Sequence, residues 1–124
     1  MTTYYTETHE WVREVDGMLY VGITSYAAEQ LGDLVYIDFA DVGSSFDKGD
    51  YCAVVESVKA ASDIYCPVKG SITKINEELV DAPELINDDA TTWMFIIMPT
   101  SDIILSENFM NEDEYNKLIK VLSS

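Results

Sequence analysis

The feature that most constrains the fold is a succession of short apolar segments separated by turn residues. Between residues 34 and 75, runs rich in valine, isoleucine and tyrosine are interrupted by turns at Gly43, Gly49 and Gly70. Runs of this length, alternating or continuously apolar, are typical of β-strands. Short strands joined by glycine turns predict a mostly β chain, folded as a sandwich or flattened barrel of two antiparallel sheets.

The N-terminal region adds a strand pair and a short helix to this pattern. Residues 8–24 alternate between apolar and polar side chains on both sides of Asp16–Gly17, a dipeptide typical of tight hairpins. Thr24 or Ser25 can then cap a short helix that ends at Gly32, because glycine favours the helix C-terminus.

The C-terminal region changes to helical spacing, which predicts a helix over about 111–122. Asn111 can act as the N-cap, and Glu114 three residues later completes a capping box. Apolar side chains at Tyr115, Leu118 and Ile119 share one face, which would pack on the sheets. We therefore expect a single domain over 1–124 with a short helix in its N-terminal half and a C-terminal helix.

A faint repeat relates two strand segments. The pattern Gly-x-apolar-x-x-Ile occurs at 32–37 and again at 70–75, an offset of 38 residues. Two similar half-units would bury facing sheets against each other, so the repeat predicts two quasi-symmetric sheets.

Composition restricts the function. The chain has 23 acidic and 7 basic residues, a net charge of −16, which opposes nucleic-acid binding and favours transient docking on basic protein surfaces. No apolar run approaches the ~20 residues of a membrane span, and the N-terminus has no transit-peptide character. We expect a cytoplasmic monomer that binds neither nucleic acid nor membranes; a mitochondrial matrix location would require a removed transit peptide.

The sequence contains few groups for catalysis or metal binding. His9 is the only histidine, and Cys52 and Cys66 form no metal-ligand spacing. If the intervening hairpin turns at Ser57–Ala60, the two cysteines lie one residue out of register and on opposite faces, which predicts free thiols. We therefore predict a non-catalytic protein without a metal site.

One stretch, Glu56-Ser57-Val58-Lys59-Ala60, stands out between two apolar strands. It places Lys59, one of only seven cationic side chains, at the tip of a predicted hairpin, where it projects into water. This stretch resembles the modification hairpin of lipoyl carriers, and in particular that of the glycine cleavage H-protein family. The resemblance extends over residues 8–98, and its further motifs are HEWV (9–12), GIT (22–24), EQLGD (29–33), KGD (48–50) and PELIN (83–87).

The resemblance implies a two-sheet fold of the lipoyl and biotinyl carrier type, a hybrid motif between a flattened barrel and a sandwich. It also implies that Lys59 is the lipoyl-lysine. Glu56, Ser57, Val58 and Ala60 would form the hairpin that a lipoate-attaching enzyme recognises.

By the same resemblance, the arm would accept an aminomethyl group from glycine decarboxylase, pass it to aminomethyltransferase and be reoxidised by dihydrolipoyl dehydrogenase. His9, Glu10 and Thr24 are candidates to line a cleft for the loaded arm.

The sequence departs from the family in one loop. After Asn87 the family continues into a loop containing proline, tyrosine and glycine, whereas residues 88–93 here read DDATTW. Two alternatives therefore stay open: an H-like carrier that relays or stores lipoate for other lipoate-dependent enzymes, and an unmodified acidic adaptor.

Overall fold

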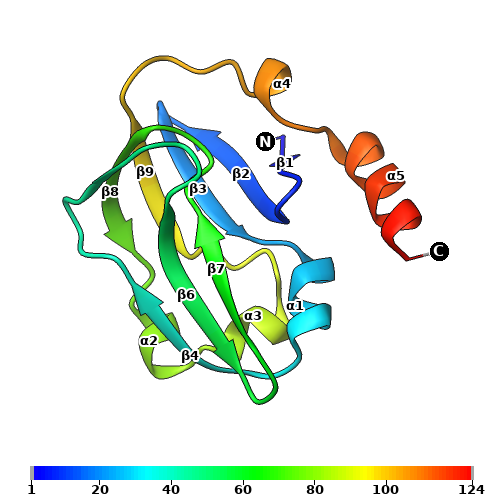
Figure 1. The fold of residues 1–124 in the computed structure, drawn as a ribbon. Helices are drawn as coiled ribbons and strands as arrows, with labels where there is room; N and C mark the ends of the chain where they lie inside the picture. The colour runs from blue at the N-terminus through cyan, green and yellow to red at the C-terminus, as the bar shows by residue number, and fades with distance from the viewer. Residues whose placement is uncertain (1, 124) are drawn as a thin grey trace.

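The computed structural model describes residues 2–123, which fold into two antiparallel sheets (Figure 1). The larger sheet has the strand order β1-β2-β3-β9-β8-β5, and the smaller sheet has the order β4-β6-β7. The predicted mostly β architecture is confirmed. The strands of the larger sheet are β1 (Tyr4–Tyr5), β2 (Glu10–Val15), β3 (Met18–Ile23), β5 (Ser45–Phe46), β8 (Gly70–Ile75) and β9 (Phe95–Pro99); those of the smaller are β4 (Leu34–Phe39), β6 (Tyr51–Ser57) and β7 (Ala61–Tyr65).

The two sheets bury one shared core. Each sheet contributes alternate side chains of its strands to this core. The two repeated sequence segments lie in different sheets: the segment at 32–37 runs into β4, and the segment at 70–75 forms β8. Removing each large aliphatic side chain from water contributes about 1.5–3 kcal/mol. The members of the core include Val12, Leu19, Val21, Ile72, Phe95 and Ile97 from the larger sheet and Leu34, Ile37, Val55 and Ile64 from the smaller.

The predicted turn between β2 and β3 is confirmed. Val15 pairs with Met18, and the intervening Asp16 and Gly17 have φ angles of 52° and 80°. Two consecutive left-handed residues are what a tight two-residue hairpin turn requires, and Gly17 adopts that conformation without a side-chain clash.

The cysteines correct one prediction. Ala53 pairs with Ile64 as the hairpin register predicts, but a bulge between Tyr51 and Ala53 shifts the pairing beyond that point. Both Cys52 and Cys66 consequently enter the core as free thiols instead of lying on opposite faces. The adjacent Cys66 thiol, together with burial, raises the pKa of Cys52, so this thiol stays protonated.

The two predicted helix caps are confirmed. Before α1 (Ser25–Leu31), Thr24 Oγ1 accepts from the Ala27 N–H at 3.2 Å. Before α5 (Glu112–Leu122), Asn111 Oδ1 accepts from the Glu114 N–H at 2.9 Å, and Glu114 Oε1 accepts from the Asn111 N–H at 3.0 Å.

Three single-turn helices complete the chain: α2 (Glu78–Asp81), α3 (Leu85–Asp88) and α4 (Leu105–Asn108). Of these, α3 begins two residues after Pro83. Across residues 2–123, no helix has both the length and the apolar character needed to cross a membrane.

Candidate functional site

The turn that joins β6 to β7 is held by Ser57. Its N–H donates to the Ala60 carbonyl at 2.8 Å, and its Oγ accepts from the Ala60 N–H at 3.0 Å and the Lys59 N–H at 3.3 Å. Serine is suited to this position because its short hydroxyl can bond to the backbone two and three residues further on. The turn is therefore rigid without any buried side chain at its tip.

Lys59 is exposed at this tip, as the sequence predicts, and so is Val58, at 74% of its surface. No other cationic residue lies on β4, β6, β7 or the turn. The lysine stem lies beside Gly32 at the end of α1, because a Cβ atom added to Gly32 would stand 3.4 Å from Lys59 Cε. The hairpin thus presents one amine, isolated from other amines, to the solvent. Figure 1 shows its tip at the end of the molecule opposite α4.

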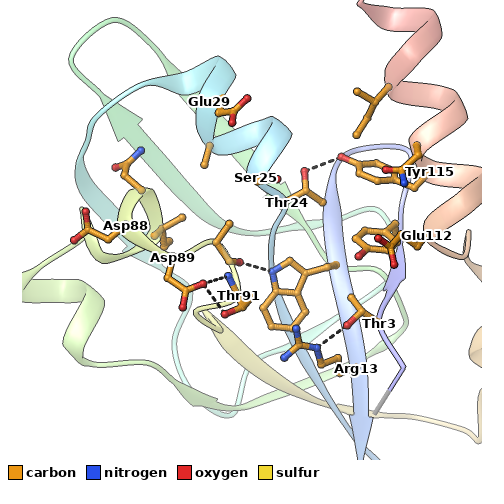
Figure 2. Close-up of a pocket in the computed structure, with 18 of the residues that line it drawn as sticks. Thr3, Arg13, Thr24, Ser25, Glu29, Asp88, Asp89, Thr91, Glu112 and Tyr115 are labelled. Carbon is orange, nitrogen blue, oxygen red and sulfur yellow. Dashed lines mark hydrogen bonds between the residues drawn. The ribbon is translucent and has the colours of Figure 1, made fainter.

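The second group of predicted residues meets at the C-terminal helix. The Tyr115 hydroxyl lies 2.8 Å from His9 Nδ1 and 2.7 Å from Thr24 Oγ1, the latter contact drawn in Figure 2. His9 adopts a left-handed φ of 71°, which turns its ring toward α5. Its burial lowers the pKa of His9, and burial raises the pKa of Tyr115, so both groups are neutral near pH 7.

Sequence reasoning placed Tyr115 only on the packing face of its helix and missed this role. Its ring also stacks on Tyr5 of β1, with the centroids 4.7 Å apart, and Tyr5 exchanges two backbone hydrogen bonds with Met110. No local sequence signal connects residue 115 with residues 9 and 24. These contacts fasten α5 to the start of β2 and α1.

Glu10 is a buried carboxyl group, with 1% of its surface exposed. Its Oε1 accepts from Thr6 Oγ1 at 2.7 Å and from Thr8 Oγ1 at 2.5 Å, whereas its Oε2 has no hydrogen-bond partner among residues 2–123. Burial raises the pKa of Glu10, although the hydroxyls of Thr8 and Thr6 and the backbone N–H of Tyr65, which also faces this carboxyl group, act in the opposite direction. A buried oxygen without a donor is costly, so this site favours a ligand or a proton that can supply one.

Two cavities flank this region. One of about 740 Å³ lies between α1, α3 and α5 and contains Thr24 and Tyr115 in its wall (Figure 2). Its wall also includes Gly32, the residue beside the Lys59 stem. The other, of about 700 Å³, includes Glu10, Thr8, Tyr65 and Cys66. The structure thus brings His9 and Thr24 together on Tyr115, but it places Thr24 and Glu10 in the walls of different cavities.

The divergent loop is anchored by Trp11 of β2. The indole N–H donates to the Ala90 carbonyl at 2.8 Å, and Asp89 accepts from the backbone and hydroxyl of Thr91, as Figure 2 shows. Hydrogen bonding to Thr91 lowers the pKa of Asp89.

Among residues 2–123, no group of three or more His, Cys, Asp or Glu side chains is arranged to hold a metal ion.

A hairpin that offers one isolated amine on a rigid two-sheet scaffold defines a protein of the lipoyl carrier class. Comparison with known proteins gives the particular family. Residues 3–122 match the family model described as glycine cleavage H-protein. The chain belongs to this family, whose members are non-catalytic lipoyl carriers of the glycine cleavage system.

Individual relatives agree with this assignment. The chain is 50% identical over 120 residues to the glycine cleavage system H protein of Bartonella tribocorum, covering 94% of this chain and 97% of the relative. The corresponding protein of Shewanella loihica is 49% identical over 118 residues, covering 93% and 91%. A crystal structure of a glycine cleavage system H protein from Mycobacterium marinum superimposes with a TM-score of 0.84 at 34% identity, covering 96% and 97% of the two chains.

Proposed function

We propose that this protein carries lipoate in amide linkage to Lys59. The observation that carries the proposal is the exposed amine of Lys59 at the tip of a turn whose backbone Ser57 fixes. A lipoate-attaching enzyme would bring an activated lipoyl group to the tip. The deprotonated amine would attack the acyl carbon, the activating group would leave, and an amide would form.

The other residues of the turn would serve recognition. Glu56 and Val58 are exposed on either side of the half-buried Ser57, and Ala60 leaves the approach to the lysine open because its side chain is small. An enzyme that docks here meets a carboxylate, an apolar side chain and an amine in a fixed order. We propose that this order, rather than an activated amine, selects Lys59.

The carrier would act in a cycle of three enzymes. Glycine decarboxylase would load the aminomethyl group on the arm, and the arm, attached to Lys59, would present it to each enzyme in turn. Aminomethyltransferase would transfer the carbon of this group to a folate and release its nitrogen as ammonia, and dihydrolipoyl dehydrogenase would reoxidise the arm with its own electron acceptor. Tethering raises the effective concentration of the arm at each enzyme, and the lipoyl group supplies the chemistry.

Glu10 is the residue best suited to hold the loaded arm. The aminomethyl group carries an amine, and its cationic form would supply the donor that the buried Oε2 lacks. Tyr65, the last residue of β7, lines the same cavity, and the other end of β7 adjoins the Lys59 turn, so the arm would lie along this strand to reach Glu10. His9 and Thr24, joined through Tyr115, would support this region from the side of α5.

The proposal is tested by the mass of the intact protein purified from a host that supplies lipoate. One lipoyl increment is expected, located on Lys59 by peptide mapping and absent from the Lys59→Arg variant. Lys69→Arg is the matched control, because the side chain of Lys69 is also exposed, at 68%, in a turn between strands. A biotinyl increment, or none, would refute lipoate attachment, and no increment would favour the unmodified acidic adaptor.

Lipoate relay or storage is the second candidate, and the divergent loop at 88–93 favours it. Asp88, Asp89, Ala90 and Thr91 line the same cavity as Gly32, so a change in this loop alters a surface near the hairpin tip where partner enzymes would dock. Reconstitution with glycine decarboxylase and labelled glycine separates the two: a glycine-cleavage carrier acquires the aminomethyl group, and a relay only passes lipoate to other carriers. We further propose a cytoplasmic location, because the relatives named above are bacterial. We also propose a monomer, because a carrier shared among several enzymes must keep its surfaces free.

A further inference from the structure

Asn87, the third residue of α3, binds both ends of a short backbone segment, Gly32–Leu34. Its Nδ2 donates to the Gly32 carbonyl at 2.9 Å, and its Oδ1 accepts from the Leu34 N–H at 2.9 Å. One planar amide therefore satisfies a backbone acceptor and a backbone donor that lie two residues apart. These bonds fix the path of the chain where α1 ends and β4 begins.

The same segment supports the tip of the β6–β7 hairpin. The Val58 N–H donates to the Asp33 carbonyl at 3.3 Å, and Leu34 is the ladder partner of Ser57. Gly32, whose carbonyl Asn87 binds, is also the residue beside the Lys59 stem. Gly32 thus lies beside the hairpin tip, Asp33 and Leu34 pair with it, and Asn87 binds both ends of this segment.

We propose that Asn87 is a positioning residue for Lys59, acting through Gly32–Leu34 to hold the hairpin in one orientation. The inference rests on the proposed function, because it assumes that Lys59 is the group that enzymes must reach. Without Asn87, the segment would sample several paths and the tip would follow it. An enzyme that accepts one orientation would then meet only a fraction of competent carriers, which raises its apparent KM without changing the chemical step.

The test compares Asn87→Ala with a matched control, Asn76→Ala. Asn76 is also half-buried and also donates Nδ2 to a backbone carbonyl, that of Trp93 at 2.8 Å. Within residues 2–123, its side chain makes no hydrogen bond to Gly32–Leu34 or to the hairpin. Two readouts are taken on folded protein. Hydrogen exchange measures the exchange rate of the Val58 amide. Kinetics with a lipoate-attaching enzyme, lipoate and ATP measure KM and kcat for the carrier.

For Asn87→Ala we expect the Val58 amide to exchange roughly tenfold faster and KM to rise roughly tenfold, with kcat within about twofold of the original. Asn76→Ala should change neither readout. If Asn87→Ala does not fold, Asn87→Asp replaces it. This isosteric variant keeps the acceptor for the Leu34 N–H but places an oxygen against the Gly32 carbonyl. The exchange rate of the Val58 amide and the KM for the carrier should therefore both rise, as in Asn87→Ala.

Unchanged Val58 exchange and KM in a folded Asn87 variant would overturn the proposal, and so would an equal change in Asn76→Ala. Failure of the proposed function has a different signature. In that case the original protein is not acylated at Lys59, while exchange at Val58 still shows whether Asn87 holds the hairpin.

Discussion

The hairpin tip at Lys59 and the corner formed by His9, Thr24 and Tyr115 differ in how far their partners lie along the chain. At the tip, the bonds that shape the turn join residues two or three positions apart. At the corner, Tyr115 binds His9 across 106 positions and Thr24 across 91. The tip is a local structure that the scaffold supports, whereas the corner exists only when the C-terminal helix has docked on the N-terminal strands.

Because of this difference, substitutions at the tip should affect modification, whereas substitutions of the buried residues should affect the free energy of unfolding. Lys59 is exposed and contributes little to the core, so its substitution should alter modification and leave folding unchanged. Glu10 and Tyr115 are buried, so their substitution should alter the free energy of unfolding as well as the surroundings of the arm.

The largest effect is expected from exchanging two neighbours at the tip, Val58→Lys with Lys59→Val. Both positions are exposed, so the free energy of unfolding should stay within about 0.5 kcal/mol of the original. Lipoylation should be abolished, because the amine would leave the turn in another direction. Intact mass and thermal denaturation measure the two quantities, and normal labelling of this variant would show that position does not select the lysine.

At the corner, Tyr115→Phe removes the hydroxyl that joins His9 to Thr24 and keeps the ring stacked on Tyr5. We expect a loss of about 1–3 kcal/mol in the free energy of unfolding, because buried polar groups lose a partner. Chemical denaturation measures it. Tyr51→Phe is the control, since Tyr51 is 61% exposed, and an equal loss in both variants would contradict the importance of the corner.

A smaller loss is expected from Ser57→Ala, which removes the hydroxyl that accepts from the Lys59 and Ala60 N–H groups. These groups are exposed, so water can replace the serine and the cost should be about 1 kcal/mol or less. Denaturation measures the cost and lipoylation kinetics measure the effect on the amine. A loss larger than that of Tyr115→Phe would reverse the comparison between tip and corner.

The smallest effect is a pH dependence at Glu10. Burial raises its pKa in the folded state above the ordinary value of 4.5, so the folded state binds more protons than the unfolded state in the window above pH 4.5. The stability of the original protein relative to Glu10→Gln should therefore fall as pH rises through this window towards neutrality. Denaturation of both proteins at several pH values measures the difference; a relative stability that rises with pH would contradict the cause assigned to the shift.

Sequence predicted the elements whose signals are local. Asp16–Gly17 specified its turn, Asn111 with Glu114 specified a helix start, and ESVKA indicated an exposed lysine; the structure contains all three features. Alternation also predicted the two sheets, because period-two burial is a property of each strand separately.

Sequence could not predict features that depend on distant partners. The bulge beside Tyr51 places Cys52 in the core with Cys66, although simple register counting puts them on opposite faces. The amide of Asn87 and the hydroxyl of Tyr115 find their partners only after folding, so neither spacing nor composition indicates their contacts. Likewise, the predicted set of Glu10 and Thr24 lines two cavities rather than one.

The smaller sheet ends in two edge strands, β4 and β7, and this order has a consequence for self-association. Edge strands offer unpaired backbone groups to which another copy could add a strand. Exposed Asp38 on β4 and Asp63 on β7 repel a second copy of the same sheet, and the net charge of −16 adds to this repulsion. The charge at these two edges therefore protects the chain from edge-to-edge aggregation, a role that is separate from the chemistry at the hairpin tip.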